Sequence, residues 1–227
     1  MGRPDTRSAL LEHGALLFAR DGVGGVSVRQ LHEAVGARNE SALQYHFGDK
    51  ARLAGEIIQL HVAAVEARRA PLVAAIAETG QQHAVRALVH ALAAPMAEDL
   101  RTPLGRAHLR LVAQLNHPAL AYEQPFRARD LPAGTAVARW LAEATAGLPG
   151  AIRRERLAAL REQLIGLFGA RAVLRDERAD PPDGVDDDVF LANLVDVLVA
   201  GLTAEVSAES LAAVTSARAA RRRRARA

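Results

Sequence analysis

Apolar side chains recur along most of the chain at intervals of three and four residues, the spacing of one face of an α-helix. In the first segment of this kind, at about 6–20, Leu10, Gly14 and Phe18 fall on one face. The same period predicts further helices at about 81–100, 103–116, 133–147, 150–176, 187–205 and 207–219. No segment has the strict alternation of a β-strand, so the chain is predicted to be all-α.

Glycines and capping residues divide the beginning of the chain into short helices. Gly22 is expected to end the first helix, because glycine favours the backbone conformation found just past a helix end. Ser27 can cap a second, short helix that Gly36 ends. For His32, within this second helix, the sequence leaves two interpretations open: an exposed side chain, or one packed between helices.

The next two predicted helices follow directly. A third short helix is expected to begin at a cap, either Asn39 or Ser41, and to turn Leu43 and Phe47 inward. A longer fourth helix is expected to extend as far as Pro71, which interrupts it because proline lacks the N–H that a helix interior needs. This fourth helix is the predicted connection between the beginning of the chain and the rest.

Two short helices joined by a tight glycine turn form the pattern of a helix-turn-helix, in which one helix braces the DNA backbone and the other enters the major groove. An outward glutamine such as Gln44 matches N6 and N7 of adenine. Tyrosine, histidine, serine and lysine side chains suit phosphate oxygens. The candidate DNA-contacting residues are Ser27, Arg29, Arg38, Asn39, Ser41, Gln44, Tyr45, His46 and Lys50.

Some of these residues have a second interpretation. Ser27 is equally well placed as a helix cap, and Arg38, Asn39 and Ser41 suit base contact, phosphate contact or capping. Lys50, the only lysine of the chain, lies at the start of the fourth helix. An ammonium group and the exposed N–H groups of a helix N-terminus both favour a phosphate at that position.

Residues 6–58, about a quarter of the chain, resemble the N-terminal DNA-binding domain of TetR-family transcriptional regulators. The resemblance is carried by the stretches TRSALLEHGALLFARDGVGGVSVRQLHEAVGA and QYHFGDKARLAGEII. Within the second stretch, Tyr45–Lys50 matches the family's Tyr-x-Phe-x-x-Lys signature. The segment from Gly36 to Phe47 is one residue longer than in many members, which leaves the base contacts before Gln44 unassigned.

The resemblance implies an all-α homodimer that regulates transcription, expected to be a repressor. A three-helix helix-turn-helix domain at 1–50 would be joined through a long helix to a helical effector-binding and dimerisation domain at 51–217. Two such DNA-binding domains would read a palindromic operator in double-stranded DNA, with half-sites about one helical turn apart. A small-molecule effector would move the connecting helix and release the DNA.

Apolar residues cover so much of the last long helices that one surface cannot bury them all. A subunit interface explains this excess, and Ala200 and Gly201 would allow two helices to approach closely. The residues assigned to the dimer interface are Leu157, Leu160, Leu164, Phe168, Phe190, Leu191, Leu194 and Leu198.

Candidate ligand-binding residues are polar or aromatic side chains within apolar helical stretches. His108, Arg110 and Gln114 lie on one predicted helix, and Arg110 and Gln114 share a face. Trp140, the only tryptophan, is the fourth candidate, with a place in the core as its alternative. Because the predicted core is aliphatic, the expected effector is a small, mainly apolar molecule.

The net charge of +3 comes from the end of the chain. Six arginines lie within the last ten residues, and without them the net charge would be −3. The first fifty residues carry six basic and six acidic side chains, so the DNA-binding interpretation depends on the motif and not on bulk charge. The Arg-rich segment 218–227 is expected to be disordered, with non-specific DNA affinity as an alternative role.

Other classes of protein are disfavoured. The sequence has no cysteine, which excludes disulfides and thiolate metal sites and suits a cytoplasmic location. No apolar run approaches the ~18–20 residues that cross a bilayer, and the first residues lack the apolar core of a signal peptide. The familiar nucleophile, phosphate-binding and metalloprotease motifs are absent, so no enzymatic activity, cofactor or metal is expected. A helical ligand-binding protein or enzyme without sequence-specific DNA binding is the alternative.

Overall fold

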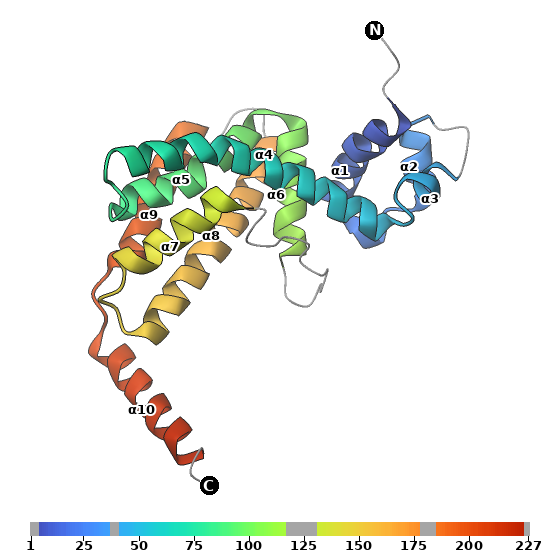
Figure 1. Ribbon diagram of the computed structural model, residues 1–227. Helices are drawn as coiled ribbons and strands as arrows, with labels where there is room; N and C mark the ends of the chain where they lie inside the picture. Colours follow the sequence, from blue (N-terminus) through green and yellow to red (C-terminus); the bar gives the residue numbers. More distant parts are fainter. Residues whose placement is uncertain (1–4, 37–40, 117–130, 178–184, 225–227) are drawn as a thin grey trace.

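The computed structural model describes residues 5–36, 41–116, 131–177 and 185–224, and throughout these ranges the chain is all-α, with about ten helices and no strand (Figure 1). The elements are α1 (Thr6–Gly25), α2 (Val28–Ala34), α3 (Ala42–His46), α4 (Lys50–Glu78), α5 (Val85–Ala97), the 3₁₀ turn η1 (Glu98–Arg101), α6 (Pro103–Leu115), α7 (Pro132–Ala144), α8 (Gly150–Glu177), α9 (Asp187–Thr203) and α10 (Ala208–Arg224).

Buried apolar side chains gather into two cores. The first core lies among α1–α4 and includes Phe18 and Leu31, both fully buried. The second lies among α4–α9 and includes Leu88 and Phe168. Helix α6 contributes to both, because Leu111 belongs to the first core while Leu109, two positions earlier, belongs to the second. α6 therefore lies between two parts of the molecule. On one side is the N-terminal unit, which consists of α1, α2, α3 and the first turns of α4, and on the other is the helical body, which consists of the rest of α4 with α5, α7, α8 and α9.

Helix α4 is continuous from the first core to the second, as the predicted connection, but it is longer than the sequence predicted. Its 29 residues correspond to a length of about 43 Å at the usual rise per residue. Pro71 was expected to end this helix, but α4 continues to Glu78. Pro71 and Ala67, whose carbonyl would have accepted the missing N–H, are both exposed. Water can therefore serve that carbonyl, and the proline is tolerated.

A second proline, Pro95, lies inside α5 and is accommodated by a side chain. Because Pro95 has no N–H, the carbonyl of Ala91 loses its partner four residues along the helix. The Nε of Arg69, on α4, donates to that carbonyl at 3.2 Å. Arg69 is itself held by an ion pair of 2.8 Å between its Nη1 and the buried carboxylate of Glu66. The hydrogen bond that compensates for this proline therefore also links α5 to α4.

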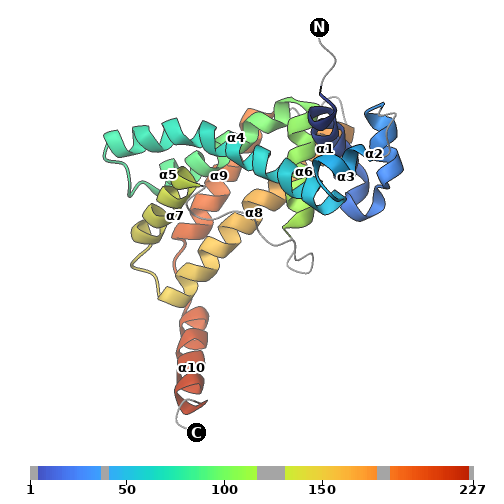
Figure 2. The ribbon, with the colours of Figure 1, turned by 45° about the vertical axis from the view of Figure 1, so that its right-hand side comes forward.

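Two helix ends differ from the prediction. Gly22 does break the first helix, with φ +74°, but one further turn follows and α1 ends at Gly25. The Arg-rich segment was expected to be disordered from residue 218, whereas α10 continues to Arg224. Figures 1 and 2 show α10 extending away from the helical body, at the end remote from α2 and α3.

Within the described ranges no single helix is long and apolar enough to cross a bilayer. Helix α9 and the first part of α10 reach the required length and composition only when taken together across a 57° bend.

Candidate functional site

Helix α2 begins with a complete capping box. The Oγ of Ser27 accepts a hydrogen bond from the backbone N of Gln30 at 3.2 Å, and the Gln30 side chain accepts one from the Ser27 backbone N at 2.8 Å. The capping interpretation of Ser27 is thus confirmed, and its phosphate contact stays a prediction. Arg29, two residues on, is exposed and pairs with Glu33 at 2.7 Å. Both side chains lie at the solvent-facing start of α2.

His32 fixes the angle between α2 and α3. Its side chain is buried, and its Nε2 accepts a hydrogen bond of 3.4 Å from the backbone N of Leu43. An imidazole at this position therefore satisfies an N–H at the start of α3 that would otherwise lack a partner. Between the two helices Gly36 has φ +61°, a conformation that favours glycine. Of the two interpretations of His32, packing between the helices is confirmed.

Helix α3 has one buried and one exposed side. Leu43 and Phe47 point into the first core, as predicted. Gln44 is exposed, and Tyr45 is 83% exposed although it is a large aromatic residue. The ring of half-buried His46 meets that of Tyr45 edge to face, with centroids 5.0 Å apart. α3 thus presents an amide, a phenol and an imidazole from three consecutive residues.

Of the other candidates preceding α3, Arg38 and Asn39 lie outside the described residues. Ser41 is exposed immediately before α3.

Lys50 makes contacts that the sequence did not predict. Its Nζ donates to the backbone carbonyl oxygen of Val26 and, at 3.1 Å, to that of Val23. These carbonyls lie at the end of α1, where the last C=O groups of a helix have no partner within it. Lys50 therefore links the start of α4 to the end of α1. Its ammonium has three N–H donors, so one remains for a phosphate.

The four candidate ligand-binding residues do not share one site. Arg110 pairs with Asp176 of α8 at 2.9 Å, and Gln114 reaches toward α1. Trp140 belongs to the second core, its alternative placement. His108 lies beside His61, with ring centroids 5.0 Å apart.

His61 belongs to a buried polar cluster that sequence reasoning missed. Its Nδ1 lies 3.6 Å from the Oδ2 of Asp99. The two oxygens of that carboxylate also accept hydrogen bonds from the Nη2 of Arg68, at 2.8 Å for Oδ1 and 2.7 Å for Oδ2. Burial lowers the pKa of His61 to about 3, and His108 and Arg68 act in the same direction. Burial also lowers the pKa of His108 and raises that of Asp99, the latter against the effect of Arg68. Both imidazoles are therefore neutral near pH 7.

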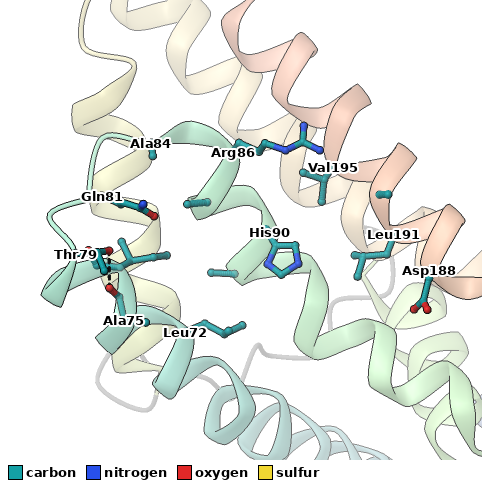
Figure 3. A pocket seen from close by; sticks show the side chains of 14 residues that line it. Leu72, Ala75, Thr79, Gln81, Ala84, Arg86, His90, Asp188, Leu191 and Val195 are labelled. Carbon is teal, nitrogen blue, oxygen red and sulfur yellow. Dashed lines mark hydrogen bonds between the residues drawn. The ribbon is translucent and has the colours of Figure 1, made fainter.

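The body also contains a cavity of about 830 Å³ that none of the predicted ligand residues lines (Figure 3). Its lining comes from the last turns of α4, from the segment between α4 and α5, from α5 and from the first half of α9. Most of the lining is apolar, with His90, Arg86 and Asp188 as its charged or titratable members. The predicted ligand residues lie on α6 and α7 instead, and their role stays a prediction. Alanines, which make the space, give no signal in a search for polar side chains.

The predicted dimer stripe is mostly used within one chain. Leu160, Leu164, Phe168, Leu194 and Leu198 are buried in the second core, and Leu157, Phe190 and Leu191 pack against it. The five buried residues face α6 and α5 of the same chain, so their side chains are not available to a partner. For the half-buried Leu157, Phe190 and Leu191, a place at a subunit interface stays a prediction. The exposed apolar residues of α8 and α9 are different ones: Leu167, Leu174, Val189 and Val197.

Neither the models of known protein families nor the curated proteins compared with the chain give a match.

Proposed function

We propose that the chain is a homodimeric DNA-binding regulator of transcription of the TetR type, a repressor that a small molecule releases from a palindromic operator. The observation that supports it most is the outer side of α3. A tyrosine that is 83% exposed stands between Gln44 and His46 on a helix that buries Leu43 beneath them. Side chains of this kind serve base edges and phosphates rather than the core.

In this proposal α3 enters the major groove and α2 braces the backbone. Gln44 reads an adenine through its amide, while Tyr45 and His46 donate to phosphates. Ser27 and Arg29, at the exposed start of α2, contact the backbone. His32 supports the geometry, because its hydrogen bond to Leu43 holds the two helices at one angle.

The dimer is assigned to the outer face of α8 and α9. Leu167 and Leu174 are 41% and 43% exposed on α8, and Val189 and Val197 are 50% and 51% exposed on α9. Unpartnered apolar residues in rows on two adjacent helices are typical of a subunit interface. Gly201 lies in the same region, and a Cβ added there would meet nothing within 4 Å, so a partner helix could come close.

The proposal is tested by gel-shift titration of the purified chain with its own promoter DNA in the presence of unrelated competitor DNA. We expect a shift that resists the competitor and a footprint with two-fold symmetry. Gln44→Ala should cost about 1–3 kcal/mol at one base pair of each half-site and leave other positions unaffected. Arg139→Ala, an exposed change on α7, is the matched control and should bind like the original chain.

Two outcomes would contradict the proposal. Binding that is the same for every DNA sequence would leave only the general attraction between basic side chains and phosphates. Unchanged operator affinity in both Gln44→Ala and Tyr45→Ala would exclude α3 as the reading helix, even if specific binding were found.

A further inference from the structure

The cavity between α4, α5 and α9 has an apolar wall on each side and a floor of small residues. Leu72 comes from α4, and Leu191 and Val195 come from α9 (Figure 3). Ile76 of α4 also lines the cavity. Between these walls α5 contributes alanines, including Ala91, whose side chains are too short to fill the space. The volume of about 830 Å³ lies within the range of about 300–1,000 Å³ typical of small-molecule sites.

The charged residues of the lining are not equivalent. Arg86 of α5 forms an ion pair with Asp196 of α9, so its charge is neutralised within the chain. The side chain of Asp188, also on α9, has neither an ion pair nor a hydrogen bond with any residue in the described part of the chain. Its exposed carboxylate lies in the first turn of α9, where the helix dipole favours a negative charge, and no cationic side chain of the described residues pairs with it. A carboxylate or phosphate ligand would be repelled by it, and a cation would be attracted.

His90 supplies a second polar group in the middle of the lining. Figure 3 shows its ring on the α5 floor, between the α4 wall and the α9 wall. It has no hydrogen-bond partner among the residues that the structure describes. A neutral imidazole offers one donor and one acceptor, so it can bind a hydroxyl or an amine N–H of a ligand.

We propose that this cavity binds a mainly apolar organic amine that is protonated at neutral pH. Its ammonium group pairs with Asp188, and its apolar body lies between Leu72 and Ile76 on one side and Leu191 and Val195 on the other. His90 binds a further polar group of the ligand where one is present. The class of ligand follows from the single unpaired carboxylate together with the apolar walls.

The consequence for DNA rests on the function proposed above. Helix α4 lines the cavity with its last turns, and its first turn holds the end of α1 through Lys50. A ligand that separates α4 from α9 would therefore move the N-terminal unit without contacting it. Binding of the amine itself does not depend on this second step.

The test uses three probes that share one rigid apolar body: 1-adamantylamine, 1-adamantanol and 1-adamantanecarboxylate. Calorimetric or NMR titration of the full chain without DNA should show the amine binding about fivefold more tightly than the alcohol, as expected for an ion pair near the surface. The carboxylate should bind most weakly. Asp188→Asn should reduce the affinity for the amine to that for the alcohol and leave the alcohol unchanged.

Matched variants separate the cavity from the rest of the surface. Ala75→Trp fills the cavity from α4 and should abolish binding of amine and alcohol, whereas Ala74→Trp, exposed on the same helix but outside the lining, should not. Glu78→Gln removes an exposed carboxylate that does not line the cavity and should leave the amine affinity unchanged. Equal binding of amine and alcohol, no binding of the amine, or full binding to Ala75→Trp would each overturn the proposal.

The amine is then added to the protein–operator complex. Release of DNA supports the coupled mechanism, while amine binding without release overturns the coupling alone. A chain that binds the amine but no specific DNA would disprove the regulator and leave the ligand site standing.

Discussion

The side-chain amide of Gln114 donates a 2.8 Å hydrogen bond to the backbone carbonyl oxygen of Ala19. This contact joins the end of α6 to α1, 95 residues earlier in the chain, beside the place where Leu111 of α6 enters the first core. The N-terminal unit is thus held to the body by two helices, α4 and α6. A movement of the helical body can therefore be transmitted to α2 and α3 through α4 or through α6.

Gln114→Ala removes this hydrogen bond. We expect the free energy of unfolding to fall by about 1 kcal/mol, the usual net contribution of such a bond. The measurement is urea unfolding followed by circular dichroism. Gln163→Ala, exposed on α8, is the control and should change stability little. If both variants unfold at the same urea concentration as the original chain, the bond does not hold α6 to α1.

Lys50→Met tests whether the lysine holds the N-terminal unit together in addition to any contact with DNA. Loss of charged hydrogen bonds to the carbonyls of Val23 and Val26 should cost about 1.5–3 kcal/mol of stability in the absence of DNA. Hydrogen exchange of amides in α1 should accelerate accordingly. Arg52→Met, a neighbouring basic residue on α4, is the comparison. A variant that keeps its stability and loses only DNA affinity would assign Lys50 to phosphate alone.

The buried histidines make stability depend on pH. In the unfolded chain His61 takes up a proton near pH 6.5, but in the folded chain its pKa is about 3. Stability is therefore full above pH 6.5 and decreases as the pH falls toward 3, by about 2 kcal/mol between pH 7 and pH 5. His108 acts in the same direction. Asp99, whose pKa is raised, opposes the trend as the pH falls through that raised pKa.

Urea unfolding at pH 7.5, 6 and 5 measures this dependence. His61→Leu should flatten the curve, since the group that takes up the proton on unfolding is gone. His83→Asn alters an exposed histidine outside the buried cluster and should retain the slope. A slope that His61→Leu leaves intact would mean that other groups dominate the acid response.

Val197→Glu introduces a charge on the face assigned to the dimer and should convert it to a soluble monomer in sedimentation experiments. The side chain is 51% exposed in the single chain, so the subunit itself should fold normally. Leu60→Glu, which alters an equally exposed apolar residue on α4, should leave the oligomeric state unchanged. A dimer that survives both changes, or a monomer before either change, would remove this face from consideration.

The helices could be predicted because their signals are local. Ser27 and Gly36 mark the two ends of the second helix, and the structure agrees with both. The continuation of α4 past Pro71 could not be predicted, because it depends on whether the carbonyl of Ala67 faces water. That is a property of packing between helices and not of the local sequence.

The candidate sites were less predictable for the same reason. Leu164 and Leu194 share the apolar spacing expected of an interface, yet they are buried within one chain. Periodicity identifies an apolar face but not the helix that covers it. The cavity was missed because it is defined by what Ala87 and Ala91 leave empty. The role of Lys50 at the α1 carbonyls required the end of α1 to be seen in three dimensions.

The contact between Arg69 and the carbonyl of Ala91 constrains how this sequence can diverge. While Pro95 is present, a change at Arg69 leaves that carbonyl without its donor and removes the cation that pairs with the buried Glu66 carboxylate, which then keeps only the backbone N–H groups of Ala133 and Gly134. If Pro95 is replaced by a residue with an N–H, the carbonyl of Ala91 accepts a hydrogen bond from its own helix. Arg69 is then needed only for its ion pair with Glu66. Descendants of this chain should therefore lose the proline before the arginine, and rarely in the opposite order.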